Sequence, residues 1–145
     1  MVKLDFGPPF KLAVISLILC GLAFPLLLTG VAQVLLPYQA NGSLVQLNGR
    51  HVGSILIAQS FSSPMFFHPR NDSASGVDPH ITLEDAYSQI PRVHAATRIP
   101  AEVLRTIIDQ NIERTLWVAG EPYVNVLKIN LILIQRYPTI YKAFT

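Results

Sequence analysis

The 25 consecutive residues Leu12–Leu36 contain no charged side chain. At about 1.5 Å per residue, a helix of this length extends some 37 Å, more than the roughly 30 Å hydrocarbon core of a bilayer. Gly21, Pro25 and Gly30 interrupt the run, and such residues are tolerated in membrane helices. We therefore predict one membrane-spanning helix over residues 12–36, closed by Pro37.

A cleaved leader is the main alternative for such a run. A signal peptide has an apolar centre of about 7–15 residues followed by a small-residue cleavage site, and no A-x-A pattern follows this longer run. A lipoprotein site at Cys20 is disfavoured because the bulky Leu19 precedes it. The sequence favours a permanent anchor.

Basic residues predict the orientation of this anchor. Lys3 and Lys11 precede the span, whereas Pro37–Gly49 after it carry no charge. Because basic residues concentrate on the cytoplasmic side, we predict a cytoplasmic tail of residues 1–11 and an extracytoplasmic domain of residues 37–145.

The predicted outer domain has 109 residues, enough for one hydrophobic core. Nine basic against eight acidic residues give it a charge near +1, so no nucleic-acid partner is indicated. The single cysteine, Cys20, lies in the membrane segment, so the outer domain is expected to fold without a disulfide.

Strand signals come first in this domain. Ser43–Leu47 alternates polar and apolar residues, and Asn48-Gly49 is a strong hairpin signal because both residues tolerate positive φ. The return strand is expected from His51 and leads into the apolar run Ile55–Ala58. Residues 69–79 are rich in Pro, Asn, Asp, Ser and Gly and predict a loop.

Helix signals follow. Thr82 is expected to cap the first helix through the Asp85 amide, and Pro91 to kink it. A second helix is predicted from Pro100 to about Arg114, and a third from Asn125 to Arg136. The apolar stripes expected on the first two are Ala86, Ile90 and Val93, and Val103, Leu104, Ile107, Ile108 and Ile112. The pattern is α+β: one transmembrane helix, then a small mixed α/β domain.

Signatures of catalysis are missing from the sequence. The four histidines lack metal-ligand spacing, and there is no G-x-S-x-G elbow or phosphate-binding G-x-x-x-x-G-K-[ST] loop. Glu84 and Asp85 are adjacent in a predicted helix, so they do not face each other. We therefore expect no catalytic residue, no metal site and no cofactor of its own.

A partner surface is the functional feature that the sequence does suggest. Amide and aromatic residues lie beside apolar runs in the predicted outer domain. At a protein interface, aromatic side chains anchor a partner and amides orient it. The alternative interpretation is that these residues form ordinary turns and that the aromatics belong to the core. Small residues in the span permit close approach of another helix. The candidate interface residues are Gly21, Pro25, Gly30, Tyr38, Gln39, Asn41, Gln59, Phe61 and His68.

An ordered set of sequence blocks resembles the C subunit of the Kdp potassium-transporting P-type ATPase. The blocks are Pro37–Leu44, Gly53–Phe61, Phe67–Arg70, Ser75–Thr82, Gln89–Val93 and Val124–Leu131. They occur in the family's order and cover nearly the whole chain. Two departures stand out: Ala58 replaces an expected glycine, and several tens of residues that the family carries between Arg70 and Ser75 are missing.

The resemblance implies an accessory subunit of a potassium pump. Its partners would be a channel-like potassium-binding subunit, a P-type ATPase subunit and a small hydrophobic subunit, all in the cell membrane. The C subunit is described as a catalytic chaperone that raises the affinity of the ATPase subunit for ATP. A role for ATP is therefore implied by the resemblance only. The alternative is a stand-alone, membrane-anchored, extracytoplasmic solute-binding protein.

Overall fold

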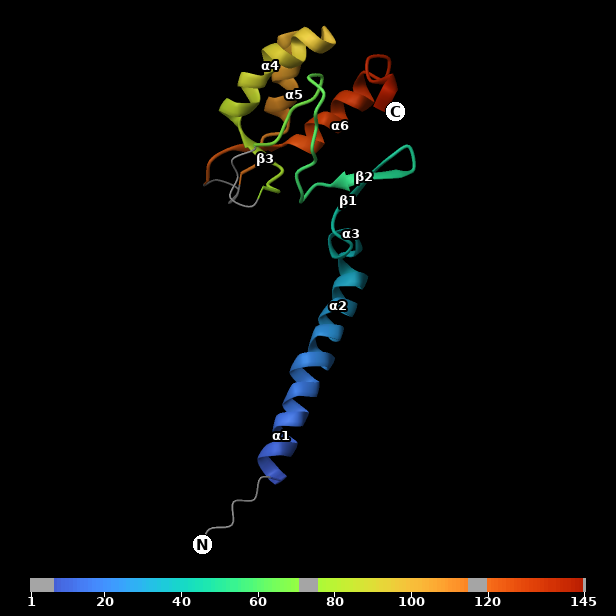
Figure 1. Cartoon of the computed structure of the whole chain (residues 1–145), viewed down its shortest axis with the longest axis vertical. Helices are drawn as coiled ribbons and strands as arrows, with labels where there is room; N and C mark the ends of the chain where they lie inside the picture. The colour runs from blue at the N-terminus through green and yellow to red at the C-terminus, as the bar shows by residue number, and fades with distance from the viewer. Residues whose placement is uncertain (1–6, 71–75, 115–119, 145) are drawn as a thin grey trace. The chain divides into compact units, whose positions relative to one another are not determined.

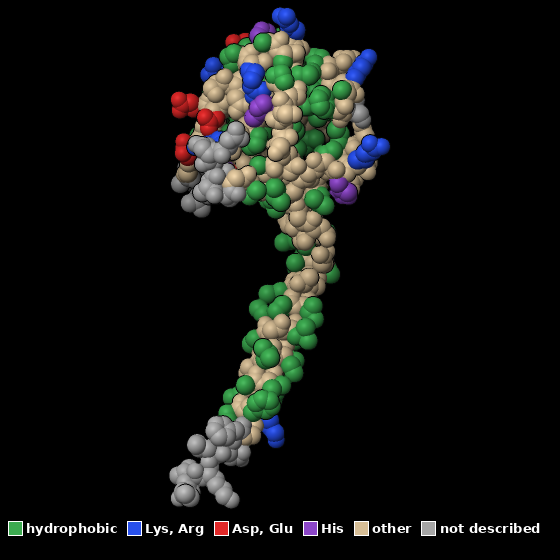
Figure 2. Space-filling view, viewed as in Figure 1, with side chains coloured by type: hydrophobic (Ala, Val, Ile, Leu, Met, Phe, Trp, Pro, Cys, Tyr) green, Lys and Arg blue, Asp and Glu red, His purple; other side chains and the backbone are tan. Residues whose placement is uncertain are grey.

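The computed structural model describes residues 7–70, 76–114 and 120–144, and the chain divides into two compact units, Met1–Ser43 and Leu44–Thr145. The first unit contains one helix of 29 residues, Gly7–Leu35, which is long and apolar enough to cross a membrane. None of its described side chains is buried, and apolar groups cover its surface (Figure 2). A helix that is apolar on every side and whose described side chains are exposed is suited to a nonpolar environment.

The long helix has an irregularity next to Pro25. It consists of α1 (Gly7–Ile18), a π-helical turn η1 (Leu19–Ala23) and α2 (Phe24–Leu35) (Figure 1). The amide of Phe24 donates to the carbonyl of Leu19, one residue farther than in an α-helix. Because Pro25 has no N–H, the preceding turn loses an α-helical bond, and a π-bulge is a common adjustment. The expected interruption at Pro25 therefore takes the form of a wider turn within a continuous helix.

The ends of the long helix differ from the predicted boundaries. It begins at Gly7, before Leu12, and its regular part ends at Leu35. Leu36 is non-helical, in line with the preference against α conformation before proline. Pro37 does close α2, but it also opens a short helix, α3 (Pro37–Ala40), that the sequence did not predict.

The second unit starts with the predicted hairpin. Strands β1 (Leu44–Leu47) and β2 (Arg50–Ser54) pair antiparallel, with an irregularity in register between Val45 and Gln46. Asn48 and Gly49 form the turn with φ values of 51° and 78°, which confirms the hairpin signal.

A second two-stranded sheet was not predicted. Strand β3 (His80–Thr82) pairs antiparallel with β4 (Tyr123–Asn125), so the predicted order of a hairpin and then helices is present but lacked this pair of strands. Each strand has three residues, too few for an alternating pattern to be recognised. Each also leads directly into a helix, so this sheet places the starts of two helices side by side.

The three main helices begin where the sequence predicted. They are α4 (Leu83–Thr97), α5 (Ala101–Gln110) and α6 (Val126–Arg136). The hydroxyl of Thr82 accepts a bond from the Asp85 amide at 3.2 Å, and the Asn125 side chain accepts one from the Lys128 amide at 3.1 Å. Both caps satisfy amides that the helix leaves without partners.

The predicted end of the second helix was wrong. Helix α5 stops at Gln110, and Asn111 closes it by bonding its side-chain amide to the Ile107 carbonyl. Ile112 is consequently exposed and contributes nothing to the buried stripe, and Arg114 lies outside the helix. The short polar side chain of Asn111 competes for a backbone group, and this local effect outweighs the apolar period.

The core of the second unit is formed by α4, α5, α6 and the segment before residue 70. Helices α4 and α5 run side by side (Figure 1), and the Tyr87 hydroxyl on α4 donates to Asp109 on α5 at 2.6 Å. A short 3-10 turn, η2 (Lys142–Phe144), follows α6. Core side chains include Phe66, Phe67, Ala86, Ile90, Val93, Leu104, Ile107, Ile108, Val124, Ile129, Leu133 and Tyr141.

Candidate functional site

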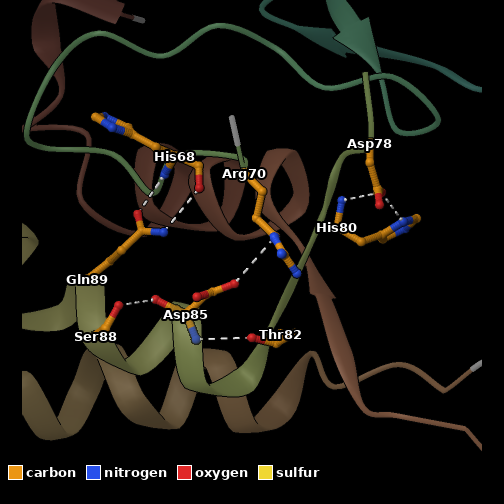
Figure 3. Close-up of polar contacts among 8 residues, drawn as sticks. All are labelled: His68, Arg70, Asp78, His80, Thr82, Asp85, Ser88 and Gln89. Atoms are coloured by element: carbon orange, nitrogen blue, oxygen red, sulfur yellow. Dashed lines mark hydrogen bonds and ion pairs between the residues drawn. The ribbon is translucent and has the colours of Figure 1, made fainter. Parts of the chain in front are cut away.

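The segment Pro64–His68 lies outside any strand, and side chains rather than a neighbouring strand bind its backbone. The Gln89 side chain on α4 accepts a bond from the His68 amide at 2.8 Å and donates to the His68 carbonyl at 3.1 Å (Figure 3). Asn130 on α6 binds Phe67 in the same way, with both distances 2.9 Å. Each amide side chain thus replaces one residue of a strand partner.

Arg92 and Tyr141 extend this set of contacts. Arg92 donates to the carbonyls of Pro64 and Phe66 at 3.0 and 2.9 Å, and to the Gln89 side-chain oxygen at 2.6 Å. Burial lowers the pKa of Arg92, and the carbonyl oxygens compensate for part of the lost hydration. The Tyr141 hydroxyl donates to the Met65 carbonyl at 2.9 Å, and burial raises the pKa of Tyr141 to about 12.

We call Gln89, Arg92, Asn130 and Tyr141 the backbone clamp. Asn130 and Tyr141 are fully buried, as is the ring of Phe67 that the clamp holds in the core. A segment bound at five successive residues has little freedom to move, so the clamp determines where His68 and the preceding residues lie. The clamp therefore fixes the position of the surface around His68, and Asn130 itself lines the larger of the two hollows beside this segment.

Two hollows open beside the clamped segment. The larger, about 320 Å³, is mainly apolar and lies between the hairpin, α6 and the C-terminal turn. The smaller, about 250 Å³, is mainly polar and includes His68, Arg70 and Gly76 in its lining. Gln59, Ser60 and Phe61 line both hollows and form the wall between them.

Gln59 packs against the hairpin at Gly53. A Cβ atom at Gly53 would lie 2.8 Å from the Gln59 Cδ, and Gly53 has a φ of 155°, which other residues rarely adopt. The Gln59 side-chain amide also donates to the Ile57 carbonyl at 3.0 Å. Glycine at position 53 therefore makes room for the wall residue.

Charged and polar side chains continue from the smaller hollow to the start of α4 (Figure 3). Arg70 Nε lies 3.8 Å from an Asp85 carboxylate oxygen, and both side chains are partly exposed. Asp78 accepts bonds from the His80 amide at 3.0 Å and pairs with the His80 ring at 3.1 Å. Within the described part of the chain, no three His, Cys, Asp or Glu residues come close enough to hold a metal ion.

The predicted interface residues divide between the two units. Gly21 and Gly30 leave open surface on the long helix, where a Cβ would meet only Leu17 or nothing. Near its end, the Asn41 side chain bonds to the Pro37 carbonyl at 2.7 Å and to Gln33 at 3.1 Å, and the Tyr38 hydroxyl donates to the Ser43 carbonyl at 3.2 Å. Gln39 lies exposed in α3. These residues shape a turn, and a partner contact for them stays a prediction.

The structure brings together Gln59, Phe61 and His68, which the sequence had only placed in separate segments. All three line the smaller hollow, and the His68 ring also lies 2.9 Å from the Ser63 carbonyl. Sequence reasoning missed the clamp that holds them. The available signal was Asn130, a single amide in the otherwise apolar stretch Ile129–Ile134.

Five of the six sequence blocks that carried the resemblance, those from Gly53–Phe61 onward, meet in this unit. The Asn125 side chain donates to the Ile55 carbonyl at 2.7 Å, the Ala58 amide to the Val77 carbonyl at 2.9 Å and the Val126 amide to the Pro79 carbonyl at 3.0 Å. Together with the clamp, these bonds join all the blocks after Gly53. These five blocks therefore form one hydrogen-bonded structure.

Comparison with known proteins gives one consistent result. A family model described as the K+-transporting ATPase, c chain, matches residues 6–73 and 71–135. A potassium-transporting ATPase KdpC subunit from Caldanaerobacter subterraneus is 33% identical, over 87% of this chain and 92% of the relative. KdpC subunits from Acidobacterium capsulatum and Geobacter sulfurreducens are each 35% identical, over 86% and 92% of this chain and 94% and 99% of theirs.

The alignments also locate a difference in length. The first relative aligns over 178 positions, whereas 87% of 145 residues is about 126, so about 50 positions fall opposite gaps in this chain. The two matched parts of the family model meet at residues 71–73. This agrees with the segment that the sequence comparison found missing between Arg70 and Ser75.

Proposed function

Because this chain belongs to the c-chain family of K+-transporting ATPases, we propose that it is a non-catalytic accessory subunit that stabilises an assembled potassium pump. The observation that carries the proposal is the long helix of 29 residues, which has no buried side chain of its own. Such a helix is suited to pack in a membrane beside other subunits. The separately folded second unit then supplies a surface for them.

The proposed topology places the N-terminus in the cytoplasm and the second unit outside the cell. Lys11 lies in the first turns of the helix, and residues 37–49 carry no charge, which supports this orientation. The proposed partners are the channel-like potassium-binding subunit, the P-type ATPase subunit and the small hydrophobic subunit. The open surface at Gly21 and Gly30 suits a neighbouring helix.

The proposed outer contact is the wall between the two hollows. Gln59 and Phe61 line both hollows, and His68 is held beside them by the backbone clamp. A surface fixed in this way costs little conformational entropy when a partner binds. A subunit changes the turnover of a pump only if it binds some states of the cycle better than others. We propose that this rigid surface binds some states of the transport cycle more tightly than others.

A role as a catalytic chaperone follows from the same mechanism. In the proposed topology, the second unit and the nucleotide lie on opposite sides of the membrane. Any increase in the affinity of the ATPase subunit for ATP is then transmitted through the complex, as a coupling between distant sites. We propose no direct contact between this chain and ATP.

Omission of this subunit tests the proposal. The pump is expressed with and without the chain and purified through a tag on the channel-like subunit. We expect the recovered complex and its potassium-stimulated ATPase activity to fall together without the chain, and the KM for ATP of the residual activity to rise. Unchanged recovery and activity would contradict the proposal. Isolation of the chain as a monomer with its own ligand affinity would instead support the solute-binding alternative.

A further inference from the structure

The larger of the two hollows beside the clamped segment adjoins a third hollow at the hairpin. Helix α6 contributes Leu127, Leu131 and Ile134 to the lining of the larger hollow, and the hairpin contributes Leu47 and Val52. The third hollow, which we call the Arg50 hollow, is lined by Leu47 and Val52 as well, together with Arg50 at the start of β2. Because the same hairpin side chains line both, the two hollows are neighbours.

The two hollows differ in chemistry. The larger hollow is mainly apolar, whereas the Arg50 hollow is mainly polar and has Arg50 as the one charged residue in its described lining. The Arg50 side chain is exposed, and no described residue forms a hydrogen bond or an ion pair with it. No described acidic residue lines either hollow. An apolar space beside an available guanidinium is complementary to a molecule with a hydrocarbon part and a negative charge.

The volume of the larger hollow limits the size of the hydrocarbon part. This hollow measures about 320 Å³, at the lower end of the range of roughly 300–1,000 Å³ for small-molecule sites. A cavity of about 150 Å³ accepts one benzene molecule, so the larger hollow has room for one hydrocarbon chain of about ten carbons. The two chains of a phospholipid would not fit together.

The charge of the site limits the head of the molecule. One guanidinium balances one negative charge, and it binds a carboxylate through two parallel hydrogen bonds. A single-chain carboxylate therefore matches both hollows. The apolar helix Gly7–Leu35 is suited to a membrane, into which such single-chain lipids partition, so they are available to this chain.

We infer that the larger hollow and the Arg50 hollow together form a binding site for a fatty-acid anion of about ten carbons. The hydrocarbon chain lies against Leu131 and Ile134 of α6 and Val52 of the hairpin, and the carboxylate pairs with Arg50. The inference concerns the second unit alone. Its test is therefore separate from that of the proposed role in the pump.

Photolabelling of the full chain in phosphatidylcholine nanodiscs tests the inference. The probe is decanoate with a diazirine at the end of its chain, and mass spectrometry locates the labelled residues. We expect labelling of residues 129–136 in α6, and excess decanoate should compete with it. Labelling of residues 12–36 serves as the internal reference for probe that has entered the bilayer.

Variants at two exposed arginines identify the head-group contact. Arg50→Gln should reduce labelling of residues 129–136 about fivefold or more, because the carboxylate loses a charged partner. Arg98→Gln, at an exposed arginine at the end of α4 that lines neither hollow, is the matched control and should leave labelling unchanged. Thermal unfolding of both variants verifies that they are folded.

Three results would overturn the inference. The first is equal labelling of residues 129–136 in Arg50→Gln and the unsubstituted chain, or no labelling there in either. The second is equal labelling by a cationic decylammonium diazirine probe, which would show that the site does not select an anion. The third is equally strong labelling by phosphatidylglycerol with a diazirine in one chain, which would identify a membrane phospholipid as the occupant.

Discussion

At the scale of single residues, Asn130 illustrates how the fold holds a segment without a strand partner. Its side chain is fully buried and satisfies both polar groups of the Phe67 backbone at 2.9 Å. A buried polar group that loses its partner costs about 1–3 kcal/mol, more than an average hydrogen bond contributes. Asn130 therefore holds the Phe67 backbone in this one position, because any other position would leave the buried N–H and C=O of Phe67 without partners.

Asn130→Ala should lower the free energy of unfolding by about 2–4 kcal/mol, because it leaves a buried N–H and a buried C=O without partners. Denaturant unfolding of the full chain in detergent measures this change. Gln110→Ala, at an exposed amide on α5, is the matched control and should change stability by less than about 0.5 kcal/mol. Equal effects of the two substitutions would show that the clamp has no structural role.

Tyr141 predicts a dependence of stability on alkaline pH. Its pKa rises from 10.0 to about 12 because the ring is buried, so the unfolded chain releases this proton before the folded chain does. The contribution of Tyr141 to the free energy of unfolding is fully present below pH 10. It decreases by about 2–3 kcal/mol as the pH rises toward 12.

Unfolding measured at pH 9 and pH 11 tests this dependence. Tyr141→Phe should be less stable at pH 9, because the Met65 carbonyl loses its donor, but its stability should fall less between the two pH values. The same fall in both proteins would mean that Tyr141 does not account for it.

At the scale of elements, local chemistry was predictable and distant pairing was not. The caps at Thr82 and Asn125 and the turn at Asn48-Gly49 involve neighbouring residues, so their geometry follows from the sequence. The sheet formed by β3 and β4 and the bonds from Asn130 to Phe67 join residues far apart in the chain, and no local pattern encodes them. The end of α5 was misplaced because the apolar period continued past Gln110.

The candidate site shows the same division. Gln59, Phe61 and His68 were selected individually from residue type, but only the fold reveals that they line one hollow. The contact between Gly53 and Gln59 depends on how the hairpin lies against the following segment. That packing could not be predicted from spacing.

The hairpin element provides a test of this packing. Gly53→Ala should destabilise the second unit by about 1–3 kcal/mol, because it combines an unfavourable φ with displacement of Gln59. Gly49→Ala, at the hairpin turn, has a positive φ but open space around its Cβ, so it isolates the backbone cost. Thermal unfolding should show the larger loss for Gly53→Ala. A larger loss for Gly49→Ala would argue against a steric role for Gly53.

At the scale of the whole molecule, the chain combines a helix that is long and apolar enough to cross a membrane with a second unit that has its own hydrophobic core. The helix contains no buried side chain, whereas the second unit buries aromatic and aliphatic residues from three helices and the clamped segment. Membership of the c-chain family of K+-transporting ATPases explains this combination, since a subunit needs both an anchor and a surface for its partners.

The central claim is that the folded second unit lies outside the cell, opposite the nucleotide. Labelling with a membrane-impermeant thiol reagent tests it in intact cells that express the assembled pump. Lys142→Cys near the C-terminus and Lys11→Cys near the start of the helix are compared in a Cys20→Ser background. The account predicts that residue 142 is labelled in intact cells and residue 11 only after permeabilisation. Labelling of residue 11 alone in intact cells would contradict it.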